Sequence, residues 1–187
     1  MNPDVLIGIA GPEASGKDTF SLKLNAMMGL KIDRFAAPIY QMAMQVDPVF
    51  QPNMTHADKQ DYVLGDARLG RRRDFLRKLG TGFGRNTINS KLWELLLDYR
   101  VEASRAAGSG VVVADVRMPS EAELILERGG IVLELCPDWT TYSKEHPTDE
   151  GLPRHLVTAQ IKLTKGDIEA GTQAIISAVT AHLRSVL

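Results

Sequence analysis

The feature that most constrains the fold is a glycine-containing stretch near the N-terminus, Gly11-Pro12-Glu13-Ala14-Ser15-Gly16-Lys17-Asp18-Thr19. It has the spacing G-x-x-x-x-G-K, and it follows residues 5–10, an uncharged run that is typical of a strand buried on both faces. Residues 18–28 then carry apolar side chains at helical spacing. In a strand–loop–helix of this kind, backbone N–H groups turn inward around phosphate oxygens, and the helix N-terminus adds partial positive charge. The sequence therefore predicts a phosphate-binding loop.

Several residues of this loop are expected to contact nucleotide phosphates: Gly11, Ala14, Ser15, Gly16, Lys17, Asp18 and Thr19. Lys17 is a mobile cation that can reach the β- and γ-phosphates of ATP. Asp18 takes the position where a hydroxyl residue usually helps to hold magnesium. We therefore choose Thr19 as the metal-side hydroxyl, directly or through water, and expect Asp18 to cap or charge the helix start.

Strands and helices alternate along the rest of the chain, which predicts an α/β fold with a parallel sheet and right-handed crossovers. We expect further strands over 30–35, 111–114, 131–135 and 161–163, and helices after Pro38 and over 68–79, 90–107, 121–128 and 168–187. The helix over 90–107 is expected to bury Leu92, Leu95, Leu96, Tyr99 and Val101. Residues 47–65 and 139–155 are polar or irregular, and we interpret them as surface segments.

A second acidic candidate, Asp115, ends the buried run 111–114. The C-terminal ends of strands are where open α/β sheets bind ligands. Beside a phosphate loop, this carboxylate is suited to hold magnesium directly or through water. The alternative is an acid at a strand end that only caps the following turn.

Composition excludes several other classes of protein. The chain has 22 Lys and Arg against 23 Asp and Glu, which excludes a uniformly basic nucleic-acid coat. The single cysteine, Cys136, excludes an internal disulfide framework and a multi-cysteine zinc site, and we interpret it as a small core residue. No apolar run approaches the ~20 residues of a membrane span, and the N-terminus lacks a secretion signal. We expect a soluble, cytoplasmic protein without polymeric nucleic acid or membrane partners, as a monomer or homodimer.

Positive charge is concentrated between residues 68 and 85, where Asp74 is the only acid. The seven basic residues there are Arg68, Arg71, Arg72, Arg73, Arg77, Lys78 and Arg85. One interpretation is a solvated face, which we favour for Arg73, Arg77 and Lys78. The other is a site for a second phosphate-bearing ligand, which arginine can grip bidentately. The segment ends in Gly80, Gly82 and Gly84, which would allow a ligand to approach the backbone closely, with Phe83 either stacked on a base or in the core.

Three stretches together resemble the phage-type deoxynucleoside monophosphate kinases of the P-loop kinase group. The first is Gly16-Lys17-Asp18-Thr19. The second is Arg73-Asp74-Phe75-Leu76-Arg77-Lys78-Leu79-Gly80-Thr81, followed by Gly84-Arg85 and Trp93. The third is Asp115-Val116-Arg117, followed by Glu121-Ala122 and Gly129-Gly130. Residues 146–153 are a weaker match.

The resemblance implies a P-loop NTPase three-layer fold in one domain over 1–187, with an inserted, mostly helical substrate lobe at about 37–107. It implies transfer of the ATP γ-phosphoryl group to a deoxynucleoside monophosphate, with Mg2+ as cofactor, in the host cytoplasm if a bacteriophage encodes the chain. Lys17, Arg117 and Asp115 would be catalytic, with Arg117 stabilising charge near the transferred group and Thr19 and Asp115 at the metal. The residues implied at the monophosphate are Phe35, Ala36, Ile39, Arg68, Thr81, Gly82 and Arg85. The segments 47–65 and 139–154 are the candidates for moving parts that exclude water.

Two alternatives remain at this point. One is another small-molecule P-loop kinase, such as a kinase of dephospho-coenzyme A. The other is a nucleotide-binding protein without kinase activity. A GTPase is disfavoured because the chain has no guanine-reading N-K-x-D tetrad.

Overall fold

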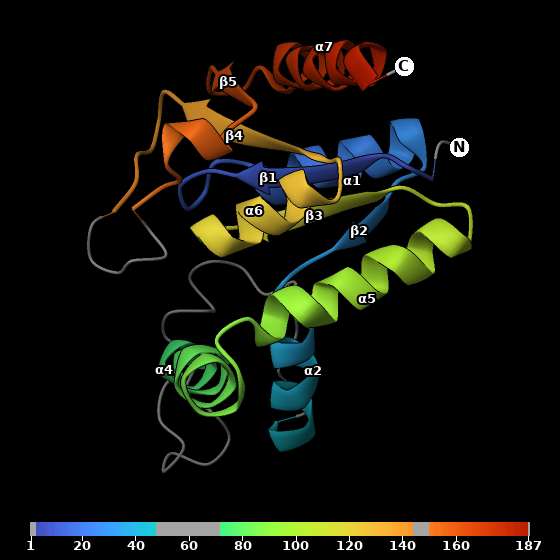
Figure 1. Ribbon diagram of the computed structural model, residues 1–187. Coiled ribbons are helices and arrows are strands. Elements are labelled where there is room, and N and C mark those ends of the chain that lie inside the picture. Colours follow the sequence, from blue (N-terminus) through green and yellow to red (C-terminus); the bar gives the residue numbers. More distant parts are fainter. Residues whose placement is uncertain (1–2, 48–71, 144–149, 187) are drawn as a thin grey trace. The chain divides into compact units, whose positions relative to one another are not determined.

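Five parallel strands form the centre of the first of two structural units (Figure 1). The computed structural model describes residues 3–47, 72–143 and 150–186. One unit comprises residues 1–35 and 97–187, and the other comprises residues 36–96. The strands are β1 (Leu6–Ala10), β2 (Lys31–Asp33), β3 (Val111–Val116), β4 (Ile131–Pro137) and β5 (Ala159–Leu163), in the order β2-β3-β1-β4-β5. The predicted α/β class and parallel sheet are confirmed.

The apolar content of each strand matches its place in the sheet. β1 occupies the centre, and all five of its residues are buried. β2 lies at an edge, carries the exposed Lys31, and is shorter than the predicted strand over 30–35. β3 and β4 each run two residues past their predicted ends, because parallel pairing with neighbouring strands continues beyond the apolar run.

Helices cover both faces of this sheet. α1 (Lys17–Met28) and α7 (Ile168–Val186) share one core with the sheet, to which they contribute Phe20, Leu24, Ile175 and Val179. α6 (Pro119–Glu127) covers the opposite face, where Ile125 lies directly on Gly8. A Cβ at Gly8 would come within 2.5 Å of Ile125 Cδ1, so glycine is required for this close packing. The unit therefore has three layers.

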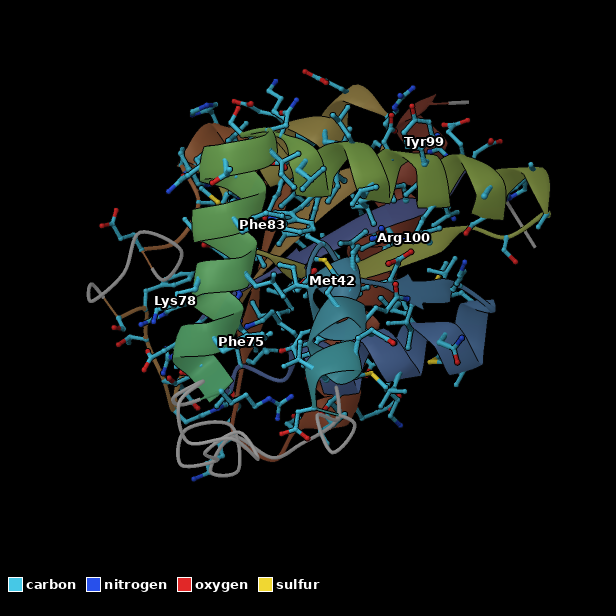
Figure 2. All side chains as sticks on the ribbon, turned by 90° about the horizontal axis from the view of Figure 1, so that it is seen from below. Met42, Phe75, Lys78, Phe83, Tyr99 and Arg100 are labelled. Atoms are coloured by element: carbon cyan, nitrogen blue, oxygen red, sulfur yellow. The ribbon has the colours of Figure 1, made fainter. Side chains whose placement is uncertain are left out.

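The described part of the second unit is helical. It contains α2 (Ala37–Val46), α4 (Arg72–Arg77), the π-helix η2 (Lys78–Ile88) and the first residues of α5 (Leu92–Ala106). Ala43 is fully buried among partly buried side chains of α2 and α4, namely Tyr40, Met44, Phe75 and Leu76. Phe75, Lys78 and Phe83 follow one another along the continuous run of α4 and η2 (Figure 2).

Two expectations about these helices are wrong. The helix predicted over 68–79 does not end at Leu79, because helical backbone continues through the glycines to Ile88. The buried apolar residues of α5 are Trp93, Leu97 and Val101, one residue from each of three successive turns; Val101 was expected, whereas the expected Leu95 and Tyr99 are exposed. Successive steps of four keep side chains on one helix face, and the expected set mixed two faces.

Some expectations concern residues outside the described part of the chain. They include Arg68, Arg71, residues 48–65 of the expected surface segment, and residues 146–149 of the weaker match. The stretch over 139–155, expected to be irregular, contains the short 3₁₀ helix η4 (Arg154–Leu156) at its end. Within the described residues, every helix is too short or too polar to cross a membrane.

Candidate phosphate-binding site

The predicted phosphate loop lies between the end of the central strand β1 and the start of α1. From β1 the chain passes to β2 at one edge, and from β3 it passes to β4 on the other side of β1. The loop therefore follows the strand at which the direction of the crossovers changes. In open α/β sheets, ligands bind outside the carboxyl ends of the strands at this point.

The backbone of the loop has positive φ angles at three residues, a feature of the loops whose N–H groups bind anions. Gly11, Ala14 and Gly16 have φ angles of 149°, 58° and 90°. Ala14 is the one non-glycine residue with a positive φ within the described residues. Gly11 also has no room for a side chain, because a Cβ there would lie 2.9 Å from Ser15 Oγ. Left-handed residues alternating with ordinary ones form a concave nest of backbone donors.

Lys17 folds back over this loop. Its Nζ donates to the Gly11 carbonyl at 2.7 Å and to the Pro12 carbonyl at 2.6 Å. Burial, and next the positive charge of Arg117, lower the pKa of Lys17 to about 8, against the opposing influence of Asp18, Glu13 and Asp115. The ammonium is thus held by neutral carbonyls, which phosphate oxygens can replace as acceptors.

Asp18 and Thr19 begin α1 and are both exposed. The Asp18 carboxylate makes no side-chain cap of the helix, and its Oδ1 accepts a hydrogen bond from Arg34 Nη2. Of the two expected roles, capping is wrong, whereas the acidic charge does lie in the first helical turn. The ion pair with Arg34 was not foreseen, since the two residues are 16 positions apart and nothing local indicates their pairing.

Asp115 lies on β3, next to β1, and near enough to Lys17 to affect its pKa. Asp115 Oδ1 accepts the backbone N–H of Phe35 at 2.8 Å. The carboxylate therefore fixes the chain as it leaves β2, at a segment that is distant in sequence. The structure brings Lys17, Asp115 and Arg117 into one electrostatic cluster.

Arg117 follows β3, and its position depends on Glu121. Glu121 Oε2 accepts the backbone N–H of Arg117 at 2.8 Å and that of Met118 at 3.1 Å. Glu121 itself is 5% exposed. This carboxylate holds the turn between β3 and α6 and leaves the Arg117 side chain exposed beside the loop.

Arg100 is a further residue that sequence reasoning missed. It projects from α5, donates through Nε to both carboxylate oxygens of Asp33 at 3.0 and 3.1 Å, and through Nη2 to the Arg34 carbonyl at 2.8 Å (Figure 2). Asp33 is 8% exposed. Arg100 Nε is thus shared between the two oxygens of a largely buried carboxylate, and this charge-assisted bond fixes the end of β2.

Trp139 makes the other missed contact with the loop. Its Nε1 donates to the Ala14 carbonyl at 3.0 Å, and its ring packs against the core.

Tyr142 follows Trp139 closely in sequence, and its Oη donates to the buried Glu134 at 2.9 Å. Burial, followed by the charge of Glu134, raises the pKa of Tyr142. Cys136, interpreted as a core residue, is half-buried on β4, and burial raises the pKa of its thiol. Isolated aromatic residues after a strand give no sequence signal of such a role.

The residues implied at a monophosphate belong to both units. Phe35 is buried in the first unit, whereas Ala36, Ile39, Thr81, Gly82 and Arg85 belong to the second. Thr81 and Gly82 are exposed on η2. Arg85 Nη1 pairs with Glu94 at 2.7 Å and donates to the Ser90 carbonyl at 3.0 Å. Arg68 lies outside the described residues.

The glycines of η2 serve internal packing at two of three positions. A Cβ at Gly84 would lie 2.1 Å from the Trp93 ring, and one at Gly80 would lie 2.9 Å from Ile39 Cδ1. Trp93 Nε1 also donates to the Gly80 carbonyl at 2.9 Å. Of the three glycines of η2, only Gly82 would place a Cβ with no neighbouring atom within 4 Å. The backbone at Gly80 and Gly84 is therefore approached closely by side chains of the same unit, where a ligand was expected. Phe83 is 49% exposed and is not a core residue.

The residues present fit a magnesium ion in the way that nucleotide sites use it. Within the described residues, no three His, Cys, Asp or Glu side chains cluster to hold a metal. Mg2+ in such sites is commonly bound by one or two protein oxygens together with the phosphates of the substrate. Thr19 and Asp115 offer a hydroxyl and a carboxylate oxygen, the hard ligands that this ion prefers.

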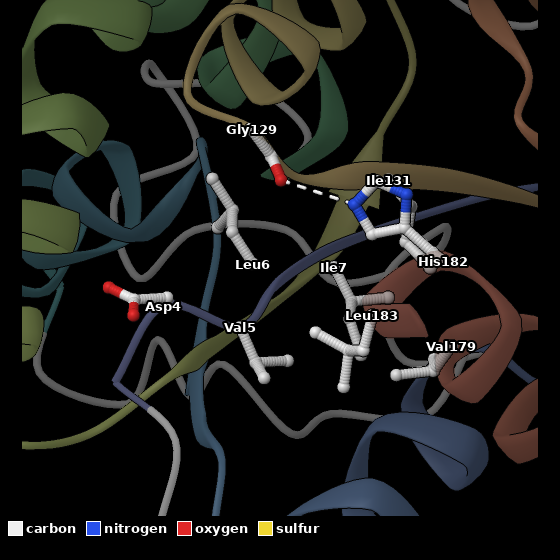
Figure 3. A pocket seen from close by; sticks show the side chains of 9 residues that line it. All are labelled: Asp4, Val5, Leu6, Ile7, Gly129, Ile131, Val179, His182 and Leu183. Carbon is white, nitrogen blue, oxygen red and sulfur yellow. Dashed lines mark hydrogen bonds between the residues drawn. The ribbon is translucent and has the colours of Figure 1, made fainter. Parts of the chain in front are cut away.

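A separate small pocket lies at the opposite ends of the strands (Figure 3). Its walls include Val5 and Leu6 at the start of β1, Ile131 at the start of β4, and His182 of α7. His182 Nε2 lies 3.3 Å from the Gly129 carbonyl oxygen. The lining is mainly apolar, and its position at the amino ends of the strands sets it apart from the phosphate loop.

Comparison with known proteins gives one sequence relative over nearly the full length. No protein-family model matches the chain. A protein of Acanthamoeba polyphaga mimivirus named "Putative deoxynucleotide monophosphate kinase" is 27% identical over 191 residues, which cover 94% of this chain and 96% of the relative.

Solved structures show the fold. The crystal structure of a "putative kinase" from Chloroflexus aurantiacus matches with a TM-score of 0.54 at 14% identity, over 99% of this chain and 98% of that chain. Dephospho-CoA kinase from Campylobacter jejuni matches over the whole of both chains with a TM-score of 0.43 at 13% identity. Taken with the parallel sheet and the loop geometry, the first likeness shows that the chain has the three-layer α/β fold of the P-loop NTPases, as predicted.

Proposed function

We propose that the chain is a P-loop phosphotransferase that transfers the γ-phosphoryl group of ATP to a deoxynucleoside monophosphate. The observation that carries the proposal is the loop after β1, where three positive φ angles and Lys17 form a nest for phosphate oxygens. The relative over 94% of the chain, named as a deoxynucleotide monophosphate kinase, supports the choice of acceptor.

The proposed reaction is an in-line displacement at the γ-phosphorus. An oxygen of the acceptor monophosphate forms a bond to the γ-phosphorus, while the bond to the β–γ bridging oxygen breaks and ADP leaves with that oxygen. The acceptor oxygen is already anionic, so no general base is needed. Catalysis of this kind depends mainly on positioning and on neutralising charge.

The residues of the cluster fit these tasks. Lys17 would exchange its carbonyl partners for phosphate oxygens and follow the γ-phosphoryl group. Arg117, held by the bonds of its turn to Glu121, would neutralise charge on the transferred group. Magnesium, when bound, would neutralise the β- and γ-phosphates, with Thr19 and Asp115 as its protein ligands. Phe35, Ala36, Ile39, Thr81, Gly82, Arg85 and Arg68 stay candidates for the acceptor site.

Arg85 is the acceptor candidate for which the structure offers a competing role. Its guanidinium pairs with Glu94, whose side chain is 5% exposed, and an arginine used this way is already engaged. Binding a monophosphate through Arg85 would therefore compete with this pairing for the five N–H donors of the guanidinium.

The test is a panel of acceptors incubated with magnesium and ATP. We expect ADP together with the matching diphosphate from one or more of the four deoxynucleoside monophosphates, measured by mass spectrometry of the products. Dephospho-coenzyme A belongs in the same panel. If dephospho-coenzyme A were the only compound phosphorylated, it would replace the deoxynucleoside monophosphate as the acceptor. If the protein bound ATP but phosphorylated no acceptor, it would be a nucleotide-binding protein without kinase activity.

A further inference from the structure

We infer that Arg34 is a positioning residue of the phosphate loop, which neutralises Asp18 and so allows an acidic residue to follow Lys17 directly. The inference rests on the proposed binding of nucleotide phosphates at this loop. It explains the one position at which the loop departs from the usual pattern of a hydroxyl residue after the lysine.

Asp18 presents an electrostatic problem to any polyanionic ligand. It lies in the first turn of α1, directly after Lys17, and its charge affects the pKa of that lysine. A carboxylate at this place repels phosphate oxygens that the helix N-terminus and Lys17 attract. Its side chain is 67% exposed, so solvent weakens the repulsion without removing it.

Arg34 forms an ion pair with Asp18. Its Nη2 bonds Asp18 Oδ1, and its own side chain is 34% exposed. The pair turns a single negative charge beside the loop into a dipole. Exposed ion pairs contribute little to folding, so stability alone does not account for holding an arginine here.

Each residue of the segment 33–35 accepts or donates a hydrogen bond that holds the segment in place. Asp33 is held by Arg100 through both carboxylate oxygens, and the Arg34 carbonyl accepts from the same guanidinium at 2.8 Å. The next N–H, from Phe35, is held by Asp115 at 2.8 Å. Because the backbone is fixed, less conformational entropy is lost when the Arg34 side chain reaches Asp18.

This arrangement links two of the acids that affect the pKa of Lys17, Asp18 and Asp115, through one short segment. Asp115 holds Phe35, and Arg34 holds Asp18, so residues 33–35 set the position of both carboxylates relative to the loop. Arg34 therefore acts through Asp18 in this account. The competing account is that Arg34 contacts a phosphate of a ligand itself, and the two make opposite predictions for a double variant.

The experiment compares Arg34→Gln, Asp18→Asn and the double variant with wild type. The probe is magnesium-ATP, its dissociation constant is measured by isothermal titration calorimetry, and melting temperature is followed in parallel. Arg184→Gln serves as a matched control, because Arg184 is an exposed arginine of α7 in the same unit. We expect Arg34→Gln to weaken binding about tenfold, because the charge of Asp18 is then uncompensated.

In the double variant we expect affinity to return to within about threefold of wild type, because both charges are gone. The difference in dissociation constant between Arg34→Gln and wild type should also decrease as the salt concentration is raised, since salt screens exposed charges. The inference is overturned if Arg34→Gln binds like the control, or if the double variant stays as weak as Arg34→Gln. Wild type that binds no ATP at all would instead refute the proposed function, and the inference with it.

Discussion

The phosphate loop and the glycine segment of η2 look alike in sequence but use glycine in opposite ways. Gly11 and Gly16 have φ angles of 149° and 90°, so the loop backbone opens into a nest of N–H groups. Gly80 and Gly84 lie inside a helical run and make room for Ile39 and Trp93. In these two segments, a positive φ therefore separates the loop glycines, which we propose to serve an anion, from the glycines that serve packing.

The cations of the two regions differ in the same way. Lys17 Nζ donates to neutral carbonyls, which phosphate oxygens can replace without leaving a charge unpaired. Arg85 is bonded to Glu94, and both side chains are largely buried. Withdrawing Arg85 toward a ligand would break this ion pair at a largely buried carboxylate, which is costly. The comparison assigns ligand binding first to Lys17.

The largest expected effect comes from Lys17→Ala. Loss of one donor to the transferred group lowers turnover by about 10²- to 10³-fold, measured as diphosphate formed per minute at saturating ATP. Lys23→Ala is the matched control, because Lys23 is an exposed lysine of the same helix. Equal activity of the two variants would remove Lys17 from the site.

The next largest effect is on folding, through Arg85→Ala. Removing one partner of a buried ion pair costs about 3 kcal/mol, so the free energy of unfolding in urea should fall by that order. Arg77→Ala, at an exposed arginine of α4, should change it little. If Arg85→Ala instead left stability intact and only raised the KM of the monophosphate, Arg85 would be a ligand residue.

Gly84→Ala and Gly82→Ala sharpen the comparison of the glycines. The methyl of Gly84→Ala would overlap the Trp93 ring, so we expect a loss of about 1–3 kcal/mol of unfolding free energy. The methyl of Gly82→Ala would enter open space, with no neighbouring atom within 4 Å, and alanine favours helical backbone by up to about 1 kcal/mol. Similar melting temperatures for both variants would contradict the packing role of Gly84.

The loop lysine also predicts a pH dependence. With its pKa lowered to about 8, Lys17 loses its proton as pH rises through 8, and an anion binds the protonated form. The affinity for ATP should therefore fall about tenfold for each pH unit well above 8, and ATP binding there should take up protons. Calorimetry in buffers of different ionisation enthalpy measures this uptake, and a release of protons on binding would contradict the assignment.

The smallest expected effect comes from Trp139→Phe. The indole N–H bond to the Ala14 carbonyl contributes about 1 kcal/mol, which corresponds to roughly fivefold in affinity for ATP. Ala14 has a left-handed φ that glycine adopts without strain, so the loss should be smaller when Ala14→Gly is also present. An equal loss in both backgrounds would show that Trp139 does not act through Ala14.

The sequence predicts well those features that depend on neighbouring residues. The loop, its strand and its helix are set within residues 6–28, and the uncharged runs indicate the central strands because burial on both faces needs them. The sequence does not predict the hydrogen bonds of Arg34 with Asp18, of Arg100 with Asp33, or of Trp139 with Ala14. Each bond joins segments that only the folded chain brings together. The wrong expectations at η2 and α5 have one cause: packing partners distant in sequence determine which glycines and which apolar face are buried.

The most direct test of the account is hydrogen–deuterium exchange with and without magnesium-ATP. The central claim is that backbone N–H groups between Gly11 and Thr19 hold the phosphates. We expect slower exchange in peptides that cover these residues when the nucleotide is bound, and unchanged exchange in the middle of α7. Bound ATP that leaves the loop peptides unprotected would contradict the account.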